Sequence, residues 1–125
     1  MSKSIMAIVA AARQAVPAIS PADAAAMMGR DDVLVVDVRD LPELAEGGKV
    51  KGAIQVSRGM LEFRADETTP YHNPAFSKAK TIILYCASGG RSALAGKALQ
   101  ELGYTKVFNL GAFKDWVATG GAVER

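Results

Sequence analysis

The sequence predicts an α/β fold: a small, mostly parallel, five-stranded sheet with helices on both faces. Short runs of β-branched and aliphatic residues alternate along the chain with segments of helical periodicity, and this alternation is typical of parallel strands joined by helical crossovers. The chain has 125 residues, of which 50% are hydrophobic, so it can bury one core but not two. We therefore expect a single globular domain.

Residues 1–19 are expected to form a leader helix ahead of the main domain, which we place at residues 20–124. Apolar residues in the leader recur at the spacing of one helix face: Ile5, Ile8, Val9, Ala12 and Val16. Because Arg13 and Gln14 interrupt the apolar run, an amphipathic helix is favoured over a secretory signal. The main domain begins at Ser20-Pro21, where an N-cap and a proline at the first helical position start a short helix.

Strands and helices then follow one another to the end of the chain. The runs with the composition of strands are Val33–Val36, Ala53–Val56, Thr81–Tyr85 and Val107–Leu110. The segments with helical character are 41–45, 58–65, 92–102 and 113–117. Residues 66–80 contain two prolines and no clear period, so we expect a long surface connection that could serve as a lid.

The composition excludes several classes of function. The net charge is +2 and the basic residues are scattered, so nucleic-acid binding is not expected. No run approaches the roughly 18 apolar residues of a membrane span, so membrane insertion is not expected. The single cysteine, Cys86, excludes an internal disulfide and a Cys-based zinc site and favours a reducing compartment, for which we expect the cytoplasm. We expect no metal and no cofactor.

Cys86 is the candidate nucleophile. It follows the strand at 81–85 directly, at the carboxyl edge of the sheet where ligands of such folds bind. The residues from Cys86 to Arg91 include two glycines and no other bulky side chain, so their N–H groups can form an anion cradle before a helix start. These dipoles and Arg91 favour a thiolate. A lone cysteine is more often a buried core residue, but this combination favours the reactive interpretation.

Other polar and aromatic residues are open to simpler interpretations. Asp37 and Arg39 end the first strand, where they either support the same edge of the sheet or pair on the surface. His72, the only histidine, is expected to be a solvated turn residue. Phe113 and Trp116 are expected to pack in the core.

A series of motifs runs along the chain. They are Asp37-Val38-Arg39, Val50-Lys51-Gly52-Ala53-Ile54, Cys86-Ala87-Ser88-Gly89-Gly90-Arg91-Ser92 and Asn109-Leu110-Gly111-Ala112-Phe113, followed by Trp116 and Gly120. Their order and spacing over residues 20–124 resemble a single-domain rhodanese. The resemblance implies a rhodanese-like fold and sulfur transfer. A sulfane sulfur would pass from a small anionic donor such as thiosulfate to the loop cysteine as a persulfide. It would then pass to cyanide or to the thiol of a small molecule or a protein.

The resemblance also implies roles for individual residues. Cys86 would be the catalytic cysteine, and Asp37 and Arg39 would support the site. The residues implied in substrate binding are Ala87, Ser88, Gly89, Gly90, Arg91, Ser92 and Lys51. Lys51 occupies a position where some two-domain relatives have an arginine. The positive charge is therefore retained, but a lysine ammonium cannot bind an anion through two parallel hydrogen bonds as a guanidinium does. Ala87 and Ser88 are neutral where some thiosulfate-using members are basic, which leaves the donor open.

Several alternative functions compete with sulfur transfer. Four residues separate Cys86 from Arg91, whereas the related phosphatases have five, so the shorter loop favours the sulfur-transferring branch. Asp37 resembles the phospho-accepting aspartate of receiver domains, but the acidic pair and the lysine that receivers need are missing. A non-enzymatic rhodanese-like persulfide carrier or partner-binding module stays open, because an intact Cys86 and Arg91 are compatible with it.

Overall fold

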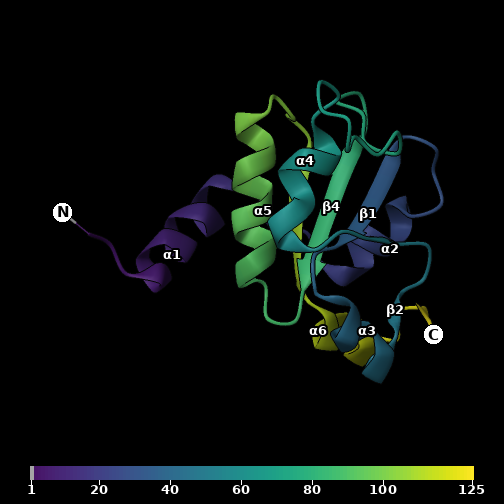
Figure 1. Ribbon diagram of the computed structural model, residues 1–125. Helices are drawn as coiled ribbons and strands as arrows, with labels where there is room; N and C mark the ends of the chain where they lie inside the picture. Colours follow the sequence, from purple (N-terminus) through teal and green to yellow (C-terminus); the bar gives the residue numbers. More distant parts are fainter. Residues whose placement is uncertain (1) are drawn as a thin grey trace.

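The structure is a computed structural model that describes residues 2–125 (Figure 1). Its helices are α1 (Ile5–Ala15), α2 (Pro21–Met27), α3 (Leu41–Gly47), the 3₁₀ turn η1 (Arg58–Met60), α4 (Leu61–Ala65), α5 (Gly90–Glu101) and α6 (Phe113–Ala118). Its strands are β1 (Val33–Asp37), β2 (Lys49–Val50), β3 (Ile54–Gln55), β4 (Thr81–Cys86), β5 (Val107–Ala112) and β6 (Val123–Glu124).

The main sheet is parallel and has the strand order β3-β1-β4-β5. The predicted α/β fold with a parallel sheet is therefore confirmed, but the predicted count of five strands is wrong for this sheet, which has four. The two further strands, β2 and β6, form a separate antiparallel pair. Each of them is two residues long, which is too short for a hydrophobic period to show in the sequence.

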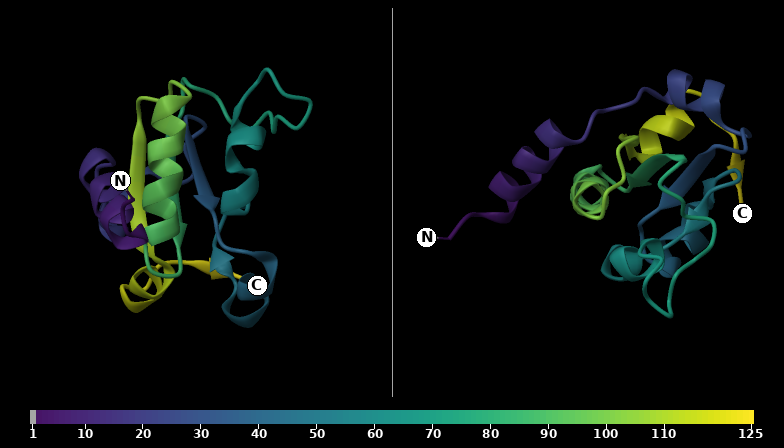
Figure 2. Two further views of the ribbon diagram at one scale, coloured as in Figure 1. Left: turned by 60° about the vertical axis from the view of Figure 1, so that its left-hand side comes forward. Right: turned by 90° about the horizontal axis from the view of Figure 1, so that it is seen from above.

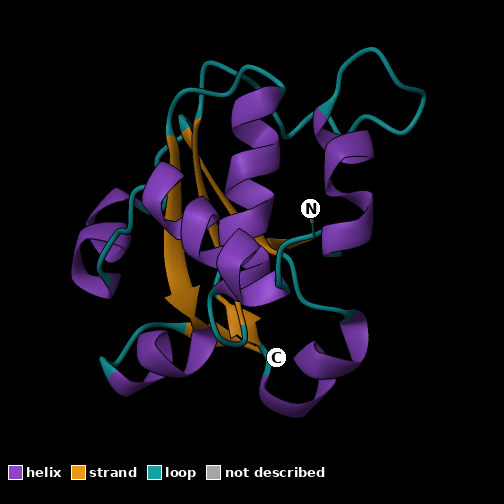
Figure 3. Ribbon diagram, turned by 90° about the vertical axis from the view of Figure 1, so that its left-hand side faces the viewer, coloured by secondary structure: helices purple, strands orange, loops and turns teal. Residues whose placement is uncertain are grey.

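Helices cover both faces of the sheet, and each face has its own hydrophobic core (Figure 3). On one face, Leu61 of α4 and Leu99 of α5 pack on β1 and β4. On the other face, Ala24 of α2 and Trp116 of α6 pack on the same strands. All six residues of β4 are buried, as the unbroken apolar run predicts for a central parallel strand.

The last two residues of β4 point to opposite faces. Cys86 belongs to the core under α4 and α5, and Tyr85 belongs to the core under α2 and α6. The Tyr85 hydroxyl accepts a hydrogen bond of 3.0 Å from the amide of Val50, and its ring stacks on Phe113. The position before the cysteine is thus anchored from the far side of the sheet.

Strand β5 contains a bulge beside this strand end. Leu84 pairs with Asn109, but Tyr85 pairs with Gly111, so Leu110 is an extra residue in β5. The shift brings Ala112 level with Cys86. The bulge thus decides which residue of β5 lies beside the cysteine.

The leader is packed against the rest of the fold. Helix α1 lies beside α5 (Figure 2), and its Val9 and Ala12, with Val16 just after it, are buried. The chain then runs along β5, where the Asn109 amide donates to Pro17 O and Asn109 O accepts from the Ile19 amide. Residues on both sides of position 20 therefore contact the sheet.

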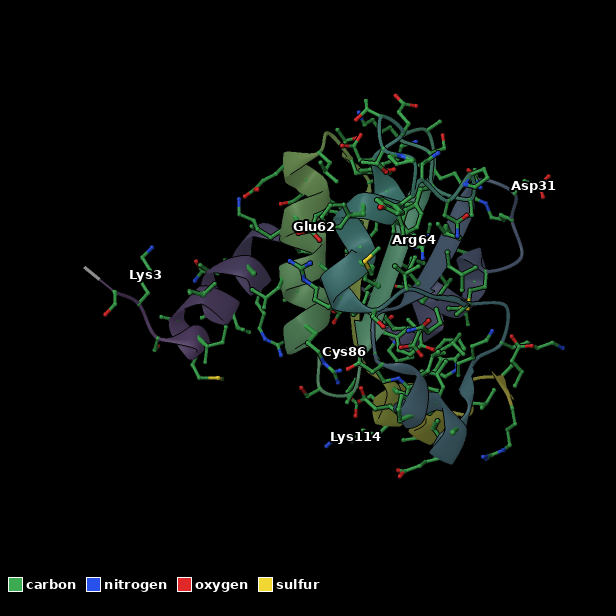
Figure 4. The ribbon with its side chains drawn as sticks, viewed as in Figure 1. Lys3, Asp31, Glu62, Arg64, Cys86 and Lys114 are labelled. Atoms are coloured by element: carbon green, nitrogen blue, oxygen red, sulfur yellow. The ribbon has the colours of Figure 1, made fainter. Side chains whose placement is uncertain are left out.

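The segment 66–80 contains no helix or strand and leads into the amino end of β4. Cys86 lies at the opposite, carboxyl end of β4, near the N-terminal end of α5 in Figure 4. The segment is therefore not placed to close over the cysteine as a lid. Among residues 2–125, none of the helices has both the length and the apolar character needed to cross a membrane.

Close packing of the leader on α5 depends on Gly96. A Cβ at this position would lie 2.7 Å from Val16 Cγ1 and 2.9 Å from Cγ2. We expect Gly96→Ala to lower the free energy of unfolding, because overpacking costs about 1–3 kcal/mol while alanine returns about 1 kcal/mol of helix propensity. Urea denaturation measures the change.

The control is Gly59→Ala in η1, where an added Cβ meets nothing within 4 Å. Gly96→Ala should lower stability relative to this control, and Val16→Ala in the same chain should relieve the loss. If Gly96→Ala and Gly59→Ala instead changed the free energy of unfolding equally, the leader would not be packed on α5 in solution.

Candidate active site

The Cys86 sulfur lies beneath a tight turn between β4 and α5. Cys86 is fully buried, whereas Ala87 and Ser88 at the tip of the turn are exposed. Gly89, the N-cap of α5, donates its amide to Cys86 Sγ at 3.0 Å. The first N–H groups of a helix have no partners within it, so the sulfur lies at the positive end of α5.

Gly89 is required by two features of this turn. Its φ is +95°, a conformation that side chains with a Cβ rarely adopt. A Cβ there would also lie 3.3 Å from Gly111 Cα and 3.1 Å from a guanidinium nitrogen of Arg13. Glycine therefore lets the turn close tightly enough for its amide to reach the sulfur.

Two buried polar side chains lie behind the sulfur. Ser92 Oγ is 3.5 Å from Cys86 Sγ and donates to Asn109 Oδ1 at 2.7 Å. Asn109 Nδ2 in turn donates to Gly89 O at 3.2 Å, which closes a ring around the turn. Ser92 has one hydroxyl proton. Beside a thiol it is donated to Asn109 Oδ1 while Ser92 Oγ accepts from the sulfur, and beside a thiolate it is donated to the sulfur instead and the bond to Asn109 is given up.

These contacts favour the thiolate. Burial alone raises the pKa of Cys86, but hydrogen bonds from the Ser92 hydroxyl and from the amides of Ser92, Ser88 and Gly89 outweigh it. The pKa of Cys86 therefore lies below its ordinary value. A lowered pKa is the condition that a nucleophilic cysteine needs near neutral pH.

Arg91 is held by a carboxylate. Its guanidinium forms a bidentate pair with Glu43 of α3, at 2.7 and 2.9 Å. These hydrogen bonds lower the pKa of Glu43 to about 2 and raise that of Arg91. The negative charge of Cys86 also contributes to the rise for Arg91, so the two charges stabilise each other. Arg91 thus joins α3 to α5. Its guanidinium, which was expected to bind the sulfur donor, binds Glu43 instead.

Asp37 and Arg39 form a buried ion pair rather than a surface pair. Both Asp37 oxygens accept from Arg39, with distances of 2.7–3.1 Å. The guanidinium also donates to Gly48 O at 2.8 Å and lies 4.4 Å from the centre of the Phe113 ring. Asp37 pairs with Tyr85 across β1 and β4, so the ion pair braces the strand position that precedes Cys86.

The structure does not bring Lys51 to the loop. Lys51 is exposed and lines a hollow together with Met28, Trp116 and Gly121. These neighbours belong to the α2 and α6 side of the sheet, whereas Cys86 faces α4 and α5. None of the residues that line this hollow comes from the turn after Cys86.

The other residues singled out from the sequence, His72 and Trp116, lie outside the site. His72, expected to be a solvated turn residue, is instead half-buried and lines a cavity of about 270 Å³ under the 66–80 segment. Trp116 is buried in the second core, as expected, with its indole N–H donating to Ala122 O.

Three residues of the site were given no role from the sequence. Asn109 is the polar exception inside an apolar strand, and that exception is a signal that could have been noticed. Glu43 is three residues after Asp40, a spacing typical of a capping box, which predicts a helix start but not a partner for Arg91. Arg13 donates to Ser88 O at 3.3 Å from α1, and nothing in the sequence indicates this contact.

Comparison with known proteins gives consistent matches. The sequence model described as "Rhodanese-like domain" matches residues 20–119. A sulfurtransferase from Allochromatium vinosum is 33% identical over 91 residues, which are 72% of this chain and 77% of that protein. Thiosulfate sulfurtransferase PspE from Escherichia coli is 35% identical over 80 residues, which are 64% of this chain and 70% of that protein.

A solved structure is similar along nearly the whole chain. It is a protein of unknown function from Rhodopseudomonas palustris, described as a possible tyrosine phosphatase, with 38% identity and a TM-score of 0.91. The match covers 99% of this chain and 96% of the other. The similarity therefore includes the leader, which lies ahead of residue 20.

The role of Ser92 can be measured directly, because Cys86 is the only thiol in the chain. We expect Ser92→Ala to raise the pKa of Cys86, because the thiolate loses a hydrogen-bond donor. The pH dependence of alkylation by iodoacetamide reports this pKa. Ser88→Ala is the control, because Ser88 acts through its amide and has an exposed side chain. An equal pKa in both variants would show that Ser92 does not stabilise the thiolate.

The Arg91–Glu43 pair should give a stability that depends on acid. The ordinary pKa of Glu43 is 4.5 and its pKa in the folded chain is about 2. The contribution is therefore fully present above about pH 4.5 and is lost as the pH falls toward 2. Urea denaturation of the wild type and Glu43→Gln should show a gap in stability near pH 7 that closes as the pH falls through this range. A gap that stays constant down to pH 2 would mean that the pair does not form in solution.

Proposed function

The chain belongs to the rhodanese-like domain family, and from this premise we propose that it is a sulfurtransferase that carries sulfane sulfur as a persulfide on Cys86. The sulfurtransferases among its relatives support sulfur transfer as the general chemistry. The observation that carries the proposal is the Cys86 sulfur at the start of α5, with the Gly89 amide 3.0 Å away and the Ser92 hydroxyl 3.5 Å away.

In the first half-reaction the Cys86 thiolate attacks the outer sulfur of thiosulfate. A new S–S bond forms to Cys86, the S–S bond of thiosulfate breaks, and sulfite leaves with the electron pair of that bond. The total charge is the same on both sides, so no proton has to move. A general base is not needed, because the lowered pKa of Cys86 already favours the thiolate.

In the second half-reaction an acceptor attacks the outer sulfur of the persulfide. With cyanide, a C–S bond forms, the S–S bond to Cys86 breaks, and thiocyanate leaves while the cysteine returns to its thiolate. A thiolate acceptor follows the same course and becomes a persulfide itself. Both the persulfide and the free thiolate are anions, so the positive end of α5 stabilises the enzyme in both of its states.

The other residues of the loop act as supports in this proposal. The turn can lie close to the sulfur because its other residues, Ala87, Ser88 and Gly90, are small. Arg91 contributes its charge near the thiolate while Glu43 fixes its position. A lone cysteine without a disulfide partner in the chain is typical of a reducing compartment, so we place the protein in one such as the cytoplasm.

Phosphate ester hydrolysis is the competing enzymatic activity, since the R. palustris protein is described as a possible tyrosine phosphatase. The geometry of the turn favours sulfur transfer instead. Only four residues lie between Cys86 and Arg91, and the Arg91 fork binds Glu43 at two points. A phosphoryl group would need both a wider turn and that same fork.

Loading with thiosulfate tests the proposed function. Thiosulfate should add the mass of one sulfur atom to the intact protein, because Cys86 is the only residue able to form a persulfide. Cyanide should remove the added mass and release thiocyanate. Intact-mass spectrometry follows both steps, and Cys86→Ser should show neither.

Three results would contradict this function. An adduct that persists in Cys86→Ser would place the sulfur elsewhere. Hydrolysis of p-nitrophenyl phosphate that depends on Cys86 would favour the phosphatase. A persulfide that forms once but turns over with cyanide no faster than free cysteine persulfide would favour a persulfide carrier or a partner-binding module.

A further inference from the structure

Arg13 places a positive charge against the turn that holds Cys86. Its Nη2 donates to Ser88 O at 3.3 Å. Its Nη1 and Nη2 lie 3.1 and 3.2 Å from the point that a Cβ on Gly89 would occupy. The guanidinium therefore lies against the residue whose amide contacts the sulfur.

Arg13 and Arg91, which lies just after this turn in α5, differ in their partners. Arg91 is held by both oxygens of Glu43, which offsets its charge. Among residues 2–125, no ion pair is found for Arg13, and its recorded hydrogen bond to Ser88 O uses one of the five donors of a guanidinium. Arg13 thus keeps donors and a net charge available for an anion.

The leader holds this guanidinium in place. Val9 and Ala12 of α1 are buried against the domain, and Gln100 Nε2 of α5 donates to Ala15 O at 2.9 Å. Arg13 itself is exposed, so its free donors face solvent at the edge of the turn. Gly89 lies against the guanidinium on one side and donates its amide to the Cys86 sulfur on the other.

We propose that Arg13 binds the anionic end of the sulfur donor, so that helix α1 completes the donor site from outside the matched family region. This inference rests on the proposed function for the identity of the donor. Its chemical class is a sulfane sulfur attached to an oxyanion group, as in thiosulfate. The guanidinium holds the sulfonate oxygens while the outer sulfur meets the Cys86 thiolate, and it then holds the sulfite that leaves.

A pair of alkylating reagents tests the anion site without using sulfur transfer. Iodoacetate and iodoacetamide have similar size and react with the same thiolate, but only iodoacetate carries a negative charge. We expect Arg13→Gln to lower the ratio of the iodoacetate to the iodoacetamide rate constant about fivefold, the effect of one unit charge at roughly 4 Å in water. Arg13→Lys should keep a large part of the ratio, and salt should weaken the wild-type preference.

Arg64→Gln is the matched control, because it removes the same charge from an exposed arginine that donates to Tyr71 O in the 66–80 segment. It should leave the ratio unchanged. An unchanged ratio in Arg13→Gln would overturn the proposal. Equal losses with both reagents are one form of this result, and they would mean that Arg13 acts on the thiolate and not on the incoming anion.

Thiosulfate kinetics separate this inference from the proposed function. Arg13→Gln should raise the KM for thiosulfate several-fold with a smaller change in kcat, because binding of the anion is what is lost. If the wild-type chain is not loaded by thiosulfate at all, the proposed function fails while the alkylation ratio still decides whether Arg13 forms an anion site. If thiosulfate loads both chains with the same KM, the function stands and the Arg13 proposal fails.

Discussion

The buried side chain of Asn109 joins the parts of the chain on which the site depends. Its amide group connects the turn, through Gly89 O, to the first turn of α5, through Ser92 Oγ. Its backbone connects both to the leader, through Pro17 and Ile19. A buried amide is costly unless its polar atoms are paired, so each of these contacts requires the others to be in place. The position of the sulfur, the helix start and the leader are consequently set together.

The opposite face of the sheet contributes rigidity to the same strand end. The Asp37–Arg39 pair is almost fully buried, and such pairs are stable only when their remaining donors are also satisfied. Here Gly48 O and the faces of the Tyr85 and Phe113 rings complete the environment of the guanidinium. Cys86 therefore follows a residue that is immobilised by a different set of contacts from those that hold the Cys86 side chain.

The fold and the position of Cys86 between a central strand and a glycine-containing turn could be predicted from the sequence because both depend on local patterns. An unbroken apolar run predicts a central strand, and a cysteine followed by glycines and an arginine predicts an anion-binding turn. The contacts of Arg13, Glu43 and Lys51 could not be predicted in the same way, since each depends on which face or edge a distant element occupies. The strand count was overestimated for the main sheet, because only four runs in the sequence have the composition of strands and all four lie in that sheet, so no run supported a fifth.

The bulge at Leu110 has a consequence for how this part of the protein can evolve. Because of the extra residue, Ala112 is level with Cys86 while Asn109 remains opposite Leu84, one step earlier in β4. Loss of a single residue between these two positions would move Ala112 out of line with the cysteine, even if every remaining side chain were unchanged. Homologous chains can therefore exchange apolar residues along β5 by ordinary substitution, whereas insertions and deletions there should be strongly counterselected. Length variation should instead collect in segments such as 66–80, which enter the sheet at the end far from the sulfur.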